Sequence, residues 1–109
     1  MINWPRVKQL WDEVGSDEFE AILRIFLREV QGVILRLQQE TERGQIEQNL
    51  HFLKGSASSL GFDQVSKLCQ DGERRAAAGN EMDAHIAEIV AAFYASKTEF
   101  DTKRKRHLR

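Results

Sequence analysis

Apolar residues recur every three or four positions along almost the whole chain, the spacing that places them on one face of an α-helix. The pattern predicts a short helix that ends at residue 15, followed by helices over about residues 16–42, 46–60, 63–79 and 80–103. No segment alternates between apolar and polar residues as a half-buried β-strand does. The sequence therefore predicts an all-α fold.

Residues that favour helix ends stand at the borders of the predicted helices. Pro5 suits the first turn of a helix, where the N–H group that proline lacks would have no helical partner, and Asn3 precedes it as the N-cap. The other N-cap candidates are Ser16, Asp17, Asp63 and Asn80. The glycines at helix ends are Gly15, Gly44, Gly61 and Gly79.

The apolar positions of the four longer segments define faces that would meet in a common core. Those positions, in chain order, are Phe19, Ile22, Phe26, Val30, Val33, Leu37, Ile46, Leu50, Leu53, Ala57, Leu60, Val65, Leu68, Cys69, Gly72, Ala76, Met82, Ile86, Ile89, Phe93 and Phe100. Four successive amphipathic helices with short connections predict an antiparallel four-helix bundle, with the short N-terminal helix over one end.

Length and composition limit the class of protein. A chain of 109 residues, 41% hydrophobic and 30% charged, is expected to form a single soluble domain over residues 1–109. It has no apolar run of about 18 residues and no signal-peptide pattern, so we expect no membrane span and place the protein in the cytoplasm. Cys69 is the single cysteine, and Cys and His nowhere have zinc-site spacing, so neither a disulfide nor a metal site is predicted.

Charge is distributed unevenly along the chain. The net charge is −1, but residues 103–109 supply five of the sixteen basic residues. The other eleven stand against seventeen acidic residues, so residues 1–101 form an acidic body with a net charge of −6. An acidic body argues against a nucleic-acid-binding core, and the basic tail at residues 103–109 is expected to fray.

One stretch of the third predicted helix carries polar residues that suggest chemistry. At about 100° per residue, His51, Gly55 and Ser58 gather opposite the leucines, and Lys54 lies one turn from His51. A glycine inside a helix costs about 1 kcal/mol relative to alanine, and open access to the imidazole would explain Gly55. An imidazole that keeps a lone pair near neutral pH, with an ammonium group beside it, suits the receipt of an anionic group from a large partner.

The segment at residues 51–61 reads His-Phe-Leu-Lys-Gly-Ser-Ala-Ser-Ser-Leu-Gly, and it matches every fixed position of the motif His-x-Leu-Lys-Gly-Ser-[Ser/Ala]-x-x-Leu-Gly. In this the chain resembles the histidine-containing phosphotransfer (HPt) domains, the four-helix phosphocarriers of two-component phosphorelays. The similarity extends downstream through Cys69 and Glu73. The length and the helix order suit this family across nearly the whole chain.

The resemblance implies a phosphorelay intermediate. His51 would accept a phosphoryl group from an aspartyl phosphate and pass it to another response regulator, and Lys54 would contact the phosphoryl oxygens. The implied partners are the receiver domains of response regulators and a hybrid sensor histidine kinase, with magnesium on the receiver and no cofactor bound by this chain. The sequence contains no phosphate-binding glycine loop, so we expect a carrier without autokinase activity.

The roles of two further residues stay open. Ser58 shares the face of His51 and would be able to bond phosphate, whereas Ser56 and Ser59 lie nearer the flanks of the helix. In several members of the family, a glutamate or glutamine at the place of Glu73 hydrogen-bonds the non-reacting ring nitrogen of the histidine. The alternative for Glu73 is an exposed ion pair with the neighbouring arginines at 74 and 75.

The second predicted helix has more apolar residues than a single buried helix face would contain. Leu23, Leu27 and Ile34 widen this face, and most of them are expected to pack against the N-terminal helix. Part of the excess would form a docking patch near His51. The compact length and the acidic body favour a monomer that binds neither nucleic acid nor membrane.

Two other classes of function compete with the carrier. A non-catalytic helical adaptor or scaffold would rely on the basic tail and would need none of the chemistry of His51. A small hydrolase using His51, Lys54 and a serine is disfavoured, because these residues lie on one exposed helical face without a cleft, an orienting acid or an oxyanion hole.

Overall fold

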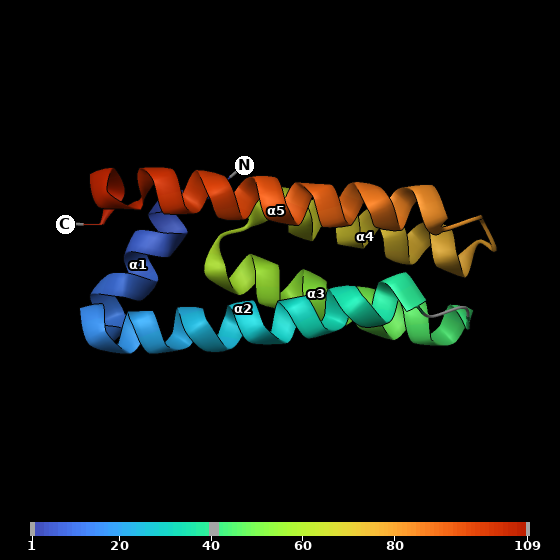
Figure 1. Cartoon of the computed structure of the whole chain (residues 1–109), viewed down its shortest axis with the longest axis horizontal. Helices are drawn as coiled ribbons and strands as arrows, with labels where there is room; N and C mark the ends of the chain where they lie inside the picture. Colours follow the sequence, from blue (N-terminus) through green and yellow to red (C-terminus); the bar gives the residue numbers. More distant parts are fainter. Residues whose placement is uncertain (1, 40–41, 109) are drawn as a thin grey trace.

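The structure is a computed structural model that describes residues 2–39 and 42–108. Within these residues it contains no strand and five helices (Figure 1). The helices are α1 (Trp4–Val14), α2 (Ser16–Gln39), α3 (Arg43–Leu60), α4 (Asp63–Ala77) and α5 (Asp83–His107). The all-α prediction is confirmed.

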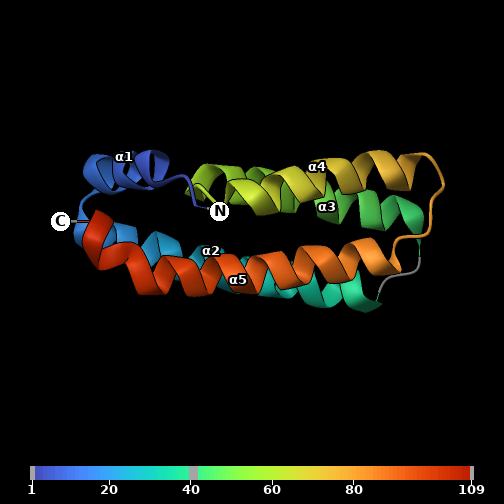
Figure 2. The same cartoon turned by 90° about the horizontal axis from the view of Figure 1, so that it is seen from above.

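The two longest helices, α2 and α5, have 24 and 25 residues and run antiparallel along a molecule of 45 × 20 × 18 Å. The α3–α4 hairpin lies against one part of this pair, and α1 lies against the other part, beyond the turn of the hairpin (Figure 2). The chain reverses direction between each pair of helices from α2 to α5. The predicted antiparallel four-helix bundle with an extra helix over one end is therefore confirmed.

The core is built from the predicted apolar faces. Nearly all of the predicted core residues are buried, and the exceptions are Ile22 and Leu68, which are half-buried. Leu23 and Ile34 are also buried and Leu27 packs against the core, so these residues do not form an exposed patch. Among the described residues, the exposed large apolar side chains are instead Ile25, Leu35, Phe52 and Tyr94.

The turn between α3 and α4 places an aromatic side chain at the centre of the molecule. Gly61 has φ +88°, its N–H group donates to Ser58 O, and the N–H group of Phe62 donates to Ala57 O, which is the Schellman arrangement. Phe62 is 1% exposed, with its ring centroid 5.4 Å from that of Phe26 and 5.8 Å from that of Phe100. The turn thereby fixes how α3 and α4 lie on α2 and α5.

Gly61 also makes room for the start of α1. A Cβ atom at this position would lie 2.8 Å from Asn3 O and 2.9 Å from Val7 Cγ2. The backbone N–H of Asn3 donates to Gly61 O at 2.7 Å, and the Asn3 side chain caps α1 by accepting from the N–H of Arg6. Gly61 therefore ends α3, as predicted, and the start of α1 also packs against it.

Two predicted boundaries around α3 and α4 are wrong. Glu42 does not belong to the second helix but precedes α3 in an extended conformation, and Gly44 lies inside the first turn of α3. Asp63 is the first residue of α4 and not its cap, because burial of Phe62 brings that residue to the N-cap position. Asp63 still complements the positive end of the helix dipole.

The ends of α5 also differ from the prediction. Asn80 does not cap α5, because the Glu81 carboxylate accepts from the N–H groups of Met82 and Asp83, both at 3.0 Å. At the other end the basic residues remain helical as far as His107. They do not fray, because Arg104 pairs with Glu20 and the ring of His107 stacks on that of Trp4, with 4.3 Å between the ring centroids.

Candidate functional site

Helix α3 presents His51 to solvent. The His51 side chain is 72% exposed, whereas Leu50, just before it, and Leu53, two residues after it, are fully buried. This is the orientation that the apolar spacing predicts. The imidazole can therefore be reached by another molecule without any rearrangement of the bundle.

Gly55 lies one turn after His51 and faces solvent as well. A Cβ atom at Gly55 would meet no atom of a neighbouring element within 4 Å. A close helix contact therefore does not explain the glycine. Its effect is to leave the surface beside the imidazole bare.

The carboxylate of Glu73, on α4, lies between His51 and Lys54. Glu73 Oε2 is 3.2 Å from His51 Nδ1, and Glu73 Oε1 is 2.9 Å from Lys54 Nζ. The neighbouring Arg74 and Arg75 pair with Asp71, at 3.2 and 3.0 Å. Of the two interpretations of Glu73, the contact with the histidine is the one that the structure contains.

The negative charge of Glu73 determines which ring nitrogen of His51 carries the proton. Partial burial raises the pKa of Glu73, but the hydrogen bonds to Lys54 and His51 and the positive charge of Lys54 outweigh it, so the pKa lies below its usual value. An ionised carboxylate can only accept a hydrogen bond. His51 Nδ1 is therefore the donor, which leaves the lone pair of a neutral imidazole on Nε2.

The lowered pKa of Glu73 predicts a pH-dependent contribution to stability. The contribution is complete above the unfolded pKa of about 4.3 and is lost as the pH falls through the lower folded pKa. Glu73→Gln should therefore lower the free energy of unfolding at pH 7, by about 0.2–1 kcal/mol for partly exposed pairs, and by less at pH 3. Urea unfolding at both pH values measures this. Glu47→Gln, on α3 but outside the cluster, is the control, and an equal loss at pH 3 and pH 7 would contradict the assignment.

Lys54 contacts α4 through its backbone carbonyl as well as through its ammonium group. Its side chain is 31% exposed, and the Ser66 hydroxyl of α4 donates to Lys54 O at 3.1 Å. Ser66 could not be identified from the sequence, because one serine on a polar helix face gives no signal of a contact with another helix. The bond ties α4 to α3 next to the His51–Glu73–Lys54 cluster.

Ser58 lies on the exposed side of α3, about two turns from His51. Among the described residues, no hydrogen bond joins its side chain to His51, Lys54 or Glu73. Ser56 and Ser59 line a groove of about 300 Å³ between α1, α2 and α3. The serines are thus near the cluster but do not belong to it.

Cys69 lies behind the cluster, in the core. Burial, with a smaller effect from the charge of Glu73, raises the pKa of Cys69 to about 12. The thiol therefore stays protonated and inert at neutral pH, so it does not act as a second nucleophile beside His51.

The described residues contain neither a metal-binding cluster nor a membrane-spanning helix. No group of three or more His, Cys, Asp or Glu side chains in residues 2–39 and 42–108 is arranged to hold a metal ion. In the same residues, none of the helices combines the length and apolar character needed to cross a membrane.

The chain is similar to known proteins. A family model described as Hpt domain matches residues 21–99. Relatives include the phosphorelay protein LuxU of Vibrio harveyi, 26% identical over 105 residues, which cover 92% of each chain. The LuxU proteins of Vibrio vulnificus strain YJ016 and Vibrio cholerae are 28% and 29% identical, over 84% and 82% of this chain and 81% and 86% of theirs. No solved structure gave a significant match. This chain belongs to the Hpt domain family.

Proposed function

We propose that this protein is a phosphorelay intermediate in which His51 carries the phosphoryl group. The observation that carries the proposal is an exposed imidazole whose Nδ1 is held by Glu73, so that Nε2 presents its lone pair to solvent. The similarity to phosphorelay proteins named LuxU supports the same reading. Transfer between proteins needs a nucleophile of this kind on an open surface.

The chemical step follows from the tautomer. Nε2 of His51 would attack the phosphorus of an aspartyl phosphate on a receiver domain, forming the N–P bond as the P–O bond to the aspartate breaks. The electron pair of that P–O bond leaves with the aspartate carboxylate. The proton on Nδ1 stays in place, and Glu73 balances the positive charge that develops on the ring. The reverse of this step would pass the group to a second receiver.

Lys54 would assist from the side of the ring that faces Glu73. Its ammonium group lies 2.9 Å from Glu73 Oε1 and is therefore held within one helical turn of His51. When a phosphoryl group arrives, Lys54 would turn toward its oxygens and offset their charge. Gly55 would keep the approach open, and Ser58 is a further candidate for a phosphate contact.

The partners would provide the rest of the machinery. Receiver domains and a hybrid sensor kinase would supply the phosphoryl group and the magnesium ion, while this chain would bind no cofactor and have no autokinase activity. We further propose that the protein is a monomer in the cytoplasm, where such receivers work. Neither nucleic acid nor membrane takes part in the transfer.

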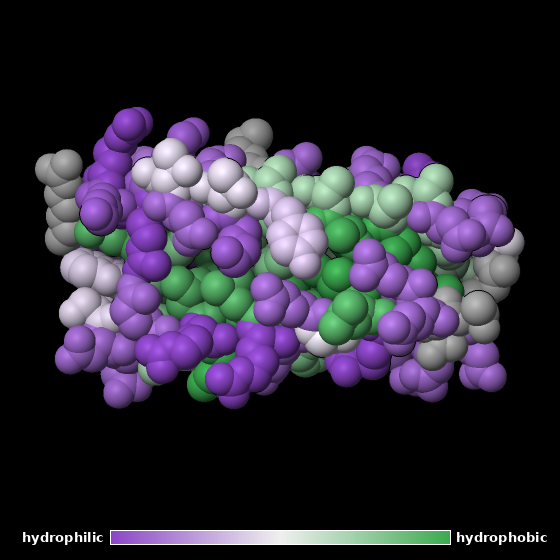
Figure 3. Space-filling view, viewed as in Figure 1, coloured by the Kyte–Doolittle hydropathy of each residue, from purple (hydrophilic) through white to green (hydrophobic). Residues whose placement is uncertain are grey.

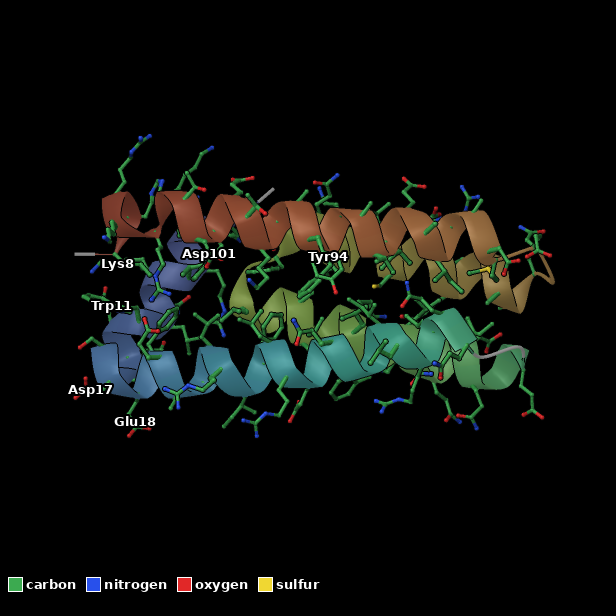
Figure 4. The ribbon with its side chains drawn as sticks, in the orientation of Figure 1. Lys8, Trp11, Asp17, Glu18, Tyr94 and Asp101 are labelled. Carbon is green, nitrogen blue, oxygen red and sulfur yellow. The ribbon has the colours of Figure 1, made fainter. Side chains whose placement is uncertain are left out.

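The surface beside His51 suits a protein partner. Phe52, the next residue on α3, is 44% exposed, and Ile25 of α2 is 55% exposed at the groove that Ser56 and Ser59 line. Tyr94 points from α5 toward α2, where apolar residues gather between the two helices (Figures 3 and 4). A receiver centred on His51 would therefore cover Phe52 first.

The test is transfer from phosphorylated receivers. Purified protein is mixed with radiolabelled receiver domains from the same genome, and label is followed on both proteins. We expect label to move to this chain with at least one receiver and to be absent in His51→Gln. The proposal fails if no receiver transfers label, or if His51→Gln accepts it equally well.

The stability of the label distinguishes the acceptor residues. A phosphohistidine is lost in acid and survives alkali, whereas a phosphoserine behaves in the opposite way. We expect more than about nine-tenths of the label to be lost in acid and retained in alkali. Acid-stable label that persists in His51→Ala would instead place the acceptor at Ser56, Ser58 or Ser59.

The scaffold alternative gains no support from the basic end of the chain. Arg104 pairs with Glu20 and packs over Phe100, with its guanidinium carbon 5.2 Å from the ring centroid. The ring of His107 stacks on Trp4. Part of the basic segment therefore stabilises the fold, so it does not form a detached tail for binding nucleic acid.

A further inference from the structure

A buried histidine of α5, His85, contacts the backbone of α4. His85 of α5 is 5% exposed, and its Nε2 atom is 3.0 Å from Leu68 O. A carbonyl oxygen can only accept, so Nε2 carries a proton and donates it to the backbone of α4. The nearest charged group to Nδ1 is Glu88 on the same helix, at 3.9 Å, which is too far for a hydrogen bond.

Gly72 provides the space that this ring occupies. A Cβ atom at Gly72 would lie 3.1 Å from His85 Cδ2 and 3.2 Å from His85 Nε2. The same atom would lie 3.0 Å from Leu50 Cδ1. The backbone of α4 at Gly72 is therefore clamped between a side chain from α5 and a side chain from α3.

The clamp lies directly behind the His51–Glu73–Lys54 cluster. Leu50 immediately precedes His51, and Gly72 immediately precedes Glu73. A shift or a rotation of α4 at Gly72 would therefore change the distance of 3.2 Å between Glu73 Oε2 and His51 Nδ1. A helix residue moves as a unit with its neighbours, because the backbone hydrogen bonds join adjacent turns.

We infer that His85 is a positioning residue, which holds α4 where Glu73 reaches the ring of His51. The bond from Nε2 to Leu68 O fixes the rotation of α4, and the packing on Gly72 fixes its distance from α5. An apolar side chain of similar size would fill the space without fixing the rotation. The consequence for transfer rests on the proposed function, whereas the effect on the His51 ring does not.

The ring nitrogens of His51 show directly whether Glu73 is in place beside the ring. Their ¹⁵N chemical shifts, measured by NMR on the intact chain, give the fraction of each tautomer. In the wild type we expect the form protonated on Nδ1 to dominate. His85→Phe, which keeps a ring but has no donor, should move the shifts toward the mixture of tautomers found in a free imidazole.

Two matched variants separate positioning from stability. His85→Gln keeps an N–H donor at the end of the side chain and should restore the wild-type shifts of His51. Ile89→Ala removes fully buried volume from the next turn of α5 and should lower thermal stability without moving those shifts. Transfer from a receiver should fall about tenfold or more in His85→Phe, the usual loss when a residue that orients another is removed.

A change on α4 gives an independent test, which also applies if His85→Phe does not fold. The methyl group of Gly72→Ala would press on His85 and Leu50, so this variant should also shift the His51 resonances. Adding His85→Ala removes the ring, so Gly72→Ala should then cost less thermal stability than it does alone. Equal costs of Gly72→Ala in both backgrounds would contradict the clamp.

The inference is overturned if the His51 shifts in His85→Phe equal those of the wild type. It is also overturned if Ile89→Ala moves them as far as His85→Phe does. If the shifts respond as expected but no receiver transfers label to the wild type, the proposed function fails and the positioning role of His85 stands.

Discussion

Glutamine in place of Gly55 is expected to leave the bundle folded and to reduce phosphotransfer at least about a hundredfold. The new side chain would extend into open space, because no neighbouring element lies within 4 Å of the Cβ position. It would stand one turn from His51 and keep a receiver from bringing its phosphorus within reach of Nε2. Displacing reacting atoms by about 1 Å costs about a hundredfold in rate. The measurement is the initial rate of label transfer, with circular dichroism as the check on folding.

Two other glycine variants give the controls. Gly55→Ala should raise the stability by about 1 kcal/mol, or about 4–8 °C in melting temperature, because alanine favours the helix. Gly44→Gln places the same side chain on the same helix, also in open space but about two turns from His51 instead of one, and should transfer phosphate normally. If Gly55→Gln unfolds the protein, or if it transfers label at the wild-type rate, the access role of Gly55 is wrong.

Removing the ring of Phe62 is expected to have the largest effect on stability. Phe62→Ala deletes a side chain that is 1% exposed and contacts aromatic rings of both α2 and α5. Loss of a buried phenylalanine side chain costs about 3–5 kcal/mol, because a cavity remains where the ring was. For a domain of this size that loss is a large fraction of the total stability. Denaturant unfolding followed by helical ellipticity measures it.

An exposed phenylalanine is the matched control. Phe52→Ala, on α3 and 44% exposed, should change the free energy of unfolding by no more than about 0.5 kcal/mol. The same variant should weaken binding of a receiver if that partner covers Phe52. A loss below about 1 kcal/mol for Phe62→Ala would mean that the turn does not anchor the two helix pairs.

The orientation of α3 was predictable from the sequence, and the contacts of α4 were not. Five apolar residues at helical spacing fix which side of α3 is buried, so they also fix the exposed side that carries His51 and Gly55. Glu73 had two possible partners, because nothing in the spacing of α4 gives its rotation relative to α3. The contact between His85 and Gly72 depends on two helices that only tertiary packing brings together.

Residues outside the regular periodicity explain the other errors. Phe62 falls in the turn after Gly61, so it has no place in a helical pattern although it is at the centre of the core. Asn80 was the predicted cap of α5, but the helix begins only at Asp83, where the Glu81 carboxylate accepts from the first N–H groups. The order at the basic end of α5 could not be predicted, because the contacts that hold it, with Glu20 and Trp4, join residues far apart in the sequence.

The stacking of Trp4 on His107 joins the two ends of the chain, and it bears on the order in which the protein folds. The α3–α4 hairpin closes through a two-residue turn, so its contacts cost little loop-closure entropy. The stack of Trp4 and His107 forms only after almost the entire chain has been brought together. We therefore expect the hairpin, with His51 and Glu73, to assemble early, and the fluorescence change of Trp4 to mark one of the last events in refolding.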